Sequence, residues 1–159
     1  MPFLYYPSQG LLVVAAATLL QIAWIDLQKY RIPNPPVVVL AAVFFLHAAV
    51  SGRWVAAYWN VAFAVLMFVP LLVFYARRLM GAGDVKLLTV AFLWVGLDCA
   101  LMFAIMLLTL VCIHAVAAKF GWAQTCATEY DKRRRIAYAP SISGALIGTF
   151  MLGCLAPAI

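Results

Sequence analysis

The sequence is short of charge. Only 10% of its 159 residues are charged and 68% are hydrophobic, whereas an average soluble domain has about 25% charged and about 45 to 50% apolar residues. This composition excludes an ordinary soluble domain. Six spans of about 20 residues would occupy most of the chain and leave no room for a second folded domain. We therefore expect a single polytopic, all-α membrane domain over residues 1–159, surrounded by the lipid bilayer.

Apolar runs, separated by charged residues, Pro and Gly, predict six transmembrane helices. No basic residue precedes the first run, so it lacks the start of a secretory signal peptide and is expected to stay as a membrane anchor. A closed barrel would need short segments of alternating polarity, but residues 101–118 are apolar almost without interruption. The expected helices lie at about 11–30, 36–51, 55–76, 82–97, 99–118 and 138–156, with a cytoplasmic loop at 119–137.

Basic residues outnumber acidic ones, 11 to 5, and give a net charge of +6. In a soluble protein this balance would suggest nucleic acid, but between membrane helices it is first a signal of topology. With six helices, every Lys and Arg except Arg53 falls on the same side. The positive-inside rule assigns that side to the cytoplasm. Both termini are then expected outside, and nucleic acid is not an expected partner.

Two aspartates adjoin long apolar runs on the expected cytoplasmic side. An ionised carboxylate in the hydrocarbon costs at least about 2.5 to 3.5 kcal/mol on insertion scales, so these positions need a reason. Asp26 lies one turn inside the end of the first expected helix. The fourth apolar run, 85–97, is too short to cross the hydrocarbon alone, which places Asp84 at a similar depth. The two carboxyls are expected to meet at one face.

A pair of neighbouring carboxyls can hydrolyse an amide without a metal. One carboxylate takes a proton from water while the other, protonated, donates to the carbonyl oxygen, and close carboxyls tend to share one proton. Gly81 and Gly83 lack a Cβ, so the turn can take left-handed torsions and an extended substrate backbone can approach Asp84 closely. Taken singly, simpler explanations exist: Asp84 as a helix N-cap, and Asp26 paired with Lys29 at the interface.

Three segments of the chain resemble the type IV prepilin peptidases, and most closely their short Flp-type (tight adherence) branch. Residues 26–34, Asp-Leu-Gln-Lys-Tyr-Arg-Ile-Pro-Asn, are similar to the first aspartate segment of that family. Residues 80–88 contain Gly-Ala-Gly-Asp-Val-Lys-Leu and are similar to its Gly-x-Gly-Asp-x-Lys-Leu segment. Residues 136–142 resemble the opening of its last helix, with Ala137 replacing a proline and Ser141 an alanine.

The resemblance implies a membrane aspartyl endopeptidase, with Asp26 and Asp84 catalytic, in the bacterial cytoplasmic (inner) membrane. Such an enzyme removes the short basic leader from type IV or Flp-type prepilins, which are single-span precursors. Larger family members also carry a cytoplasmic Cys-x-x-Cys metal module and methylate the new pilin N-terminus. The four cysteines here have no Cys-x-x-Cys spacing. The expected peptidase therefore has no metal, no cofactor and no methyltransferase activity.

Residues near the two aspartates are expected to have supporting roles. Lys86 is expected to snorkel rather than to pair with Asp84, and Asn34 to cap the second helix or to bond the active loop, with capping preferred. Substrate binding or loop shaping is assigned to Gly81, Gly83, Lys86 and Asn34.

His47 and His114 are expected to pack between helices rather than to relay protons. Cys99 and Cys154 either pair on the outer side or, as expected for most of the four cysteines, fill apolar space. The oligomeric state and the identity of the pilin stay open.

Other functions would use the same residues. Within the protease class, the alternative is an archaeal-type preflagellin peptidase or another Gly-x-Gly-Asp intramembrane protease. From another class, a small ion or proton transporter subunit would use the same two carboxyls for binding or relay. A pure scaffold would tolerate the loss of both carboxyls.

Overall fold

The computed structural model describes residues 5–120 and 138–152, with side chains from residue 9 onward. Within these ranges the chain is all-helical, without a strand. The prediction of an all-α fold with six helices is thus confirmed for the described part of the chain. The helices are α1 (Tyr5–Lys29), α2 (Asn34–Ser51), α3 (Trp54–Ala76), α4 (Ala82–Val95), α5 (Ala100–Lys119) and α6 (Ala139–Met151).

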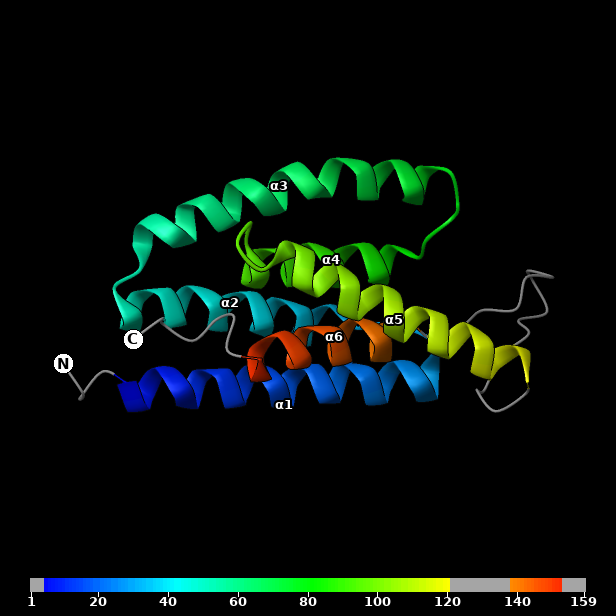
Figure 1. Ribbon diagram of the computed structural model, residues 1–159, viewed down its shortest axis with the longest axis horizontal. Coiled ribbons are helices and arrows are strands. Elements are labelled where there is room, and N and C mark those ends of the chain that lie inside the picture. The colour runs from blue at the N-terminus through cyan, green and yellow to red at the C-terminus, as the bar shows by residue number, and fades with distance from the viewer. Residues whose placement is uncertain (1–4, 121–137, 153–159) are drawn as a thin grey trace.

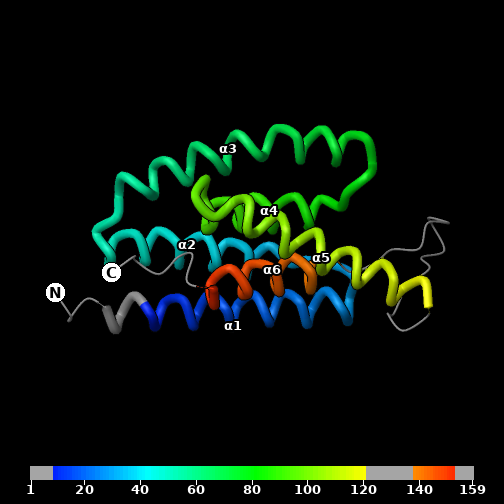
Figure 2. The backbone as a smooth tube through the Cα atoms, in the orientation of Figure 1, coloured from blue at the N-terminus to red at the C-terminus, as the bar shows by residue number. Residues whose placement is uncertain are grey.

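Successive helices alternate in direction and form one elongated bundle (Figures 1 and 2). The ends of α1, α3 and α5 therefore lie with the starts of α2, α4 and α6, at the right of Figure 1. Six of the described basic residues follow or begin these segments, and we name this end the basic end: Lys29, Arg31, Arg77, Arg78, Lys86 and Lys119. Arg53, between α2 and α3, lies at the opposite end.

The two shortest helices, α4 and α6, are the most deeply buried for their length. Leu87, Ala91 and Trp94 of α4 are fully buried, because α4 packs against α3, α2 and α6. On α6, small residues let the backbone approach its neighbours closely, as is usual between membrane helices. A Cβ added at Gly144 would lie 3.1 Å from Leu110 Cδ1 of α5. The bundle is therefore two short central helices held by four longer ones.

The four longer helices are those suited to cross a membrane. Among the described residues, Gln9–Lys29, Asn34–Ser51, Trp54–Ala76 and Ala100–Lys119 are long and apolar enough to do so. With 14 and 13 residues, α4 and α6 fall short of the roughly 20 that a full span needs. The prediction of six spans is thus supported for four helices. For α4 the reason is local, because Gly96 takes φ 62° and ends the helix at Val95 rather than at residue 97.

Large apolar side chains cover the outside of the bundle. Val55 on α3 and Leu101 on α5 are each 75% exposed. An apolar exterior of this kind is stable in lipid and unfavourable in water. The chain is therefore a multi-pass membrane protein in its shape as well as in its composition.

Candidate active site

Asp26 is a buried carboxyl in the last turn of α1, only 5% exposed. The helix ends at Lys29, three residues later, and the next residue, Tyr30, takes φ 49° and donates its N–H to the Asp26 carbonyl at 2.8 Å. The side chain of Asp26 points to α6, because its Oδ2 accepts a hydrogen bond from the backbone N–H of Ala139 at 3.2 Å. A backbone donor from the start of α6 thus fixes one oxygen of this carboxyl.

Asp84 approaches from a different helix. Gly81 is the N-cap of α4, and Asp84 lies in its first turn, so the interpretation of Asp84 as the N-cap is wrong. Its carboxyl folds back over the helix start, since a Cβ added at Gly81 would lie 3.0 Å from Asp84 Oδ2. The carboxyls of Asp84 and Asp26 are near enough to interact electrostatically. The structure therefore places the two predicted carboxyls, from α4 and α1, within electrostatic range of each other.

The two glycines beside Asp84 serve packing rather than unusual torsions. Gly81 has φ −73° and ψ 148°, and among the described glycines only Gly52 and Gly96 have positive φ. The left-handed torsions that glycine permits are therefore not adopted at Gly81 or Gly83, because the chain enters α4 from an ordinary extended residue. Gly83 instead lies against the loop after α1, where a Cβ would be 3.0 Å from Ile32 Cβ. Its missing side chain lets α4 begin close to that loop.

Lys86 and Asn34 form a second link between the two aspartate segments. Lys86 Nζ donates to Asn34 Oδ1 at 3.0 Å, from α4 to the first residue of α2. No side chain caps α2, whose N-cap is Pro33. The preferred expectation that Asn34 caps this helix is therefore wrong, and Asn34 instead accepts a bond from α4, two residues after Asp84. Lys86 makes a specific bond and does not only snorkel.

Sequence reasoning missed the part that α6 plays at this site. The Ala139 N–H bonds Asp26, and Ser141 Oγ lies 3.2 Å from His114 Nδ1 of α5. The signal was present in the third resembling segment, which contains both Ala139 and Ser141. A backbone N–H has no sequence identity of its own, so no residue type marked this contact. His47 packs against Trp94, with ring centroids 5.7 Å apart, as expected.

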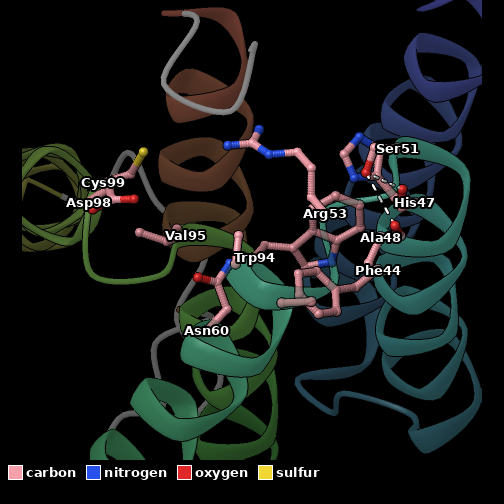
Figure 3. A pocket seen from close by; sticks show the side chains of 12 residues that line it. Phe44, His47, Ala48, Ser51, Arg53, Asn60, Trp94, Val95, Asp98 and Cys99 are labelled. Atoms are coloured by element: carbon pink, nitrogen blue, oxygen red, sulfur yellow. Dashed lines mark hydrogen bonds between the residues drawn. The ribbon is translucent and has the colours of Figure 1, made fainter. Parts of the chain in front are cut away.

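A second polar feature lies at the opposite end of the bundle. Figure 3 shows a pocket where the ends of α2 and α4 meet the start of α3, with Arg53 extending between His47 and Asp98. Asp98 is its only acidic residue. The pocket thus has charge but no pair of carboxyls, and paired-acid chemistry is confined to the basic end among the residues that the structure describes.

No three His, Cys, Asp or Glu residues are placed to hold a metal ion within the described ranges. The absence of a metal or cofactor stays a prediction. Cys99 is disulfide-bonded, and Cys112 is a free, exposed thiol on α5. The suggested pairing of Cys99 with Cys154 concerns a residue outside the described ranges.

These features define a class: a helical, multi-pass membrane protein with two carboxyls brought together from separate helices. The model of the type IV leader peptidase family matches residues 13–129, well over half of the chain, and this chain belongs to that family. It is therefore a protease, and so a hydrolase. The matched region contains both Asp26 and Asp84 but ends before α6. No curated protein and no solved structure matches the chain.

Proposed function

We propose that this protein is a prepilin leader peptidase of the aspartyl type, acting on Flp-type precursors. It hydrolyses the peptide bond that joins a short basic leader to the hydrophobic segment of a single-span pilin precursor. The observation that carries the proposal is the meeting of Asp26 and Asp84 from α1 and α4, inside the region that matches the family.

The hydrogen bond to Asp26 suggests how the two carboxyls divide the work. Ala139 N–H donates to Asp26 Oδ2, and a donor of this kind stabilises negative charge on the carboxylate. Asp26 is therefore the base that removes a proton from water as the water oxygen attacks the substrate carbonyl carbon. Asp84 carries the shared proton and donates it to the carbonyl oxygen. When the tetrahedral intermediate collapses, Asp84 recovers that proton and Asp26 protonates the leaving amine.

The position of the pair suits a substrate held by the membrane. The carboxyls lie at the basic end, which the positive-inside rule assigns to the cytoplasm. A single-span precursor with its leader in the cytoplasm would present its scissile bond at that depth. The protein would then reside in the cytoplasmic membrane with both termini outside. A peptide approaching Asp84 would pass Gly81, whose lack of a Cβ leaves that carboxyl accessible.

The same enzyme is proposed to lack methyltransferase activity. Larger family members are expected to carry a Cys-x-x-Cys module for that function, and this sequence has no such spacing. Incubation with the cleaved pilin and a methyl donor should leave the new N-terminus unmodified. A methylated product on mass spectrometry would contradict this part of the proposal.

Cleavage of a co-expressed Flp-type prepilin tests the peptidase activity. Asp26→Asn and Asp84→Asn should each lower cleavage by at least about 100-fold, because each removes one partner of general acid–base catalysis. Asp98→Asn is the matched control, since Asp98 is an exposed carboxyl at the opposite end. It should cut like the wild type, and membrane levels of all variants should be equal.

Other outcomes would identify the alternatives. If the wild type does not shorten the precursor, or if both Asn variants still cut, the peptidase proposal fails. Loss of ion flux in the Asn variants without accumulated precursor would indicate a transporter. Silent substitutions in well-inserted protein would indicate a scaffold. Cleavage of a preflagellin but of no prepilin would indicate the archaeal-type specificity.

A further inference from the structure

The pocket at the opposite end is open to a ligand with charges of both signs. Arg53 and Asp98 line it together with His47, Ser51 and Asn60, while Trp94 forms part of its apolar wall (Figure 3). Ser51 Oγ is already used, because it donates to the His47 carbonyl at 2.7 Å. Arg53 and Asp98 are both exposed. Among the residues that the structure describes, the charged groups here are thus one cation and one anion, on different loops.

An apolar groove runs between the same three helices, nearer the middle of the bundle. Its lining residues come from α2 (Phe45), α3 (Val61, Ala64, Val65 and Phe68) and α4 (Thr89, Val90 and Leu93). The only polar side chain among them is satisfied within its own helix, since Thr89 Oγ1 donates to the Val85 carbonyl at 2.8 Å. The groove therefore offers no hydrogen bond and suits a hydrocarbon.

The pocket and the groove are two parts of one surface. On each of the three helices, a residue that lines the pocket is next in sequence to a residue that lines the groove. These pairs are Phe44 and Phe45 on α2, Asn60 and Val61 on α3, and Trp94 and Leu93 on α4. On α3 the lining positions 56, 57, 60, 61, 64, 65 and 68 form neighbouring pairs that recur every fourth residue, so they lie on one side of the helix. A molecule lying along this face would have a polar end at the pocket and an apolar body in the groove.

The length of this surface corresponds to one leaflet of a membrane. Ala57 and Phe68 on α3 are 11 residues apart, which is roughly 16 Å at about 1.5 Å per residue. Half of a hydrocarbon core of about 30 Å is about 15 Å. With the pocket at the level of the headgroups, the pocket and groove together would therefore reach to about the bilayer centre.

We propose that this surface binds one phospholipid with a phosphoethanolamine headgroup, from the leaflet at the opposite end. The phosphate lies beside Arg53, the ammonium group beside Asp98, and one acyl chain lies in the groove between α2, α3 and α4. The start of α3, which has no side-chain cap, adds N–H donors on the phosphate side. A zwitterionic headgroup matches the two opposite charges of the pocket, whereas a purely anionic headgroup would offer Asp98 no positive group to pair with.

Lipid retention by the full-length protein tests this site directly. The protein is extracted from mixed nanodiscs of phosphatidylethanolamine and phosphatidylglycerol, and retained lipids are measured by native mass spectrometry. The wild type should retain one phosphatidylethanolamine in preference to phosphatidylglycerol. Arg53→Gln and Asp98→Asn should each lower that retention about tenfold, the equivalent of one lost charge-assisted contact. Arg77→Gln, an exposed arginine at the basic end, is the matched control and should retain the lipid.

The acyl-chain part of the site has its own pair of variants. Val65 and Val69 of α3 are 61% and 59% exposed, but only Val65 lines the groove. Val65→Trp should therefore displace the lipid, and Val69→Trp should not. Prepilin cleavage and helical circular dichroism, measured on every variant, confirm that each protein is folded.

Defined results would overturn the proposal. Equal retention of the two lipids shows that the headgroup is not selected, and equal retention by Arg53→Gln, Asp98→Asn and the wild type shows that the pocket is not used. Equal loss in Val65→Trp and Val69→Trp removes the groove from the site. If soluble glycerophosphoethanolamine competes as well as the intact lipid does, the ligand is a free headgroup compound. The proposed binding of an acyl chain in the groove is then wrong.

Discussion

The two ends of the bundle are held together in different ways. At the basic end, polar bonds join separate helices: Ala139 N–H to Asp26, Lys86 to Asn34, and His114 with Ser141. Toward the opposite end, aromatic rings make the contacts between helices, with Trp94 5.5 Å from Phe44 and 5.3 Å from Phe150 between centroids. Both ends contain charge, but among the described residues carboxyls approach each other only at the basic end. A polar pocket alone therefore does not identify the reaction centre.

Substitutions at the two ends should therefore have different effects. Changes among the aromatic rings should lower stability and affect cleavage only through loss of folded protein. Changes among the polar links should affect cleavage in protein that remains folded. Single substitutions at each end can distinguish an effect on stability from an effect on cleavage.

Trp94→Ala should have the largest effect on stability. Trp94 is fully buried, contacts the rings of Phe44 and Phe150, and donates to the Leu40 carbonyl at 3.1 Å. Truncation of such a residue costs about 3 to 5 kcal/mol of unfolding free energy. Trp24→Ala is the control, because Trp24 is 64% exposed. Equilibrium unfolding in bicelles gives the unfolding free energy of both variants. Equal losses of unfolding free energy would contradict the central role of Trp94.

Gly83→Val should disturb the basic end most among the non-catalytic changes. A Cβ at Gly83 would lie 3.0 Å from Ile32 Cβ, so a branched side chain must push α4 away from the loop after α1. Overpacking of this kind costs about 1 to 3 kcal/mol, and the displaced Asp84 should lower kcat more than it raises KM. Gly148→Ala, where the nearest atom would be Met106 Sδ at 3.8 Å, should be tolerated. Normal cleavage by Gly83→Val would show that the close packing of this glycine against Ile32 is not needed to position Asp84.

Loss of the Lys86–Asn34 bond should have a smaller effect. Both side chains are exposed, so the bond is worth about 0.5 kcal/mol or less. Lys86→Met, Asn34→Ala and the double variant should form a cycle in which the second substitution adds almost nothing. Asn34→Asp should retain most of the activity, because a carboxylate also accepts from Lys86. Additive losses in cleavage rate would show that the two residues act separately.

Arg53→Gln should leave cleavage unchanged within about twofold. Arg53 lies between α2 and α3, at the opposite end from both carboxyls, and exposed charges separated by more than about 10 Å are largely screened at 0.1 M salt. Steady-state cleavage of the precursor in detergent measures this. A large loss would show that the two ends are coupled and would break the comparison.

Much of this architecture could be predicted from sequence because apolar runs and their interruptions are local signals. The six helices follow from them, and the meeting of Asp26 and Asp84 followed from the depth at which two runs begin or end. The lengths of α4 and α6 did not follow, since Val95 and Met151 end their helices while the sequence remains apolar nearby. Hydrophobicity shows where a helix is stable but not where its last turn closes.

Contacts that depend on backbone atoms or on close packing were the least predictable. The Ala139 N–H at Asp26 depends on how α6 packs against α1. The role of Gly83 depends on Ile32, 51 positions earlier. Neither Gly81 nor Gly83 adopts the left-handed torsions that the sequence allowed, because glycine permits such torsions without requiring them. The left-handed residues beside the site are Tyr30 and Arg78, which no turn signal marked.

The most direct test of the central claim is whether Asp26 and Asp84 act as one unit. The residual cleavage rates of Asp26→Asn, Asp84→Asn and the double variant should be measured on the same precursor at equal membrane levels. Groups that act together are strongly non-additive, so the double variant should be as slow as the slower single variant, within about twofold. If the two losses multiply instead, the carboxyls act independently and the paired-acid account is contradicted.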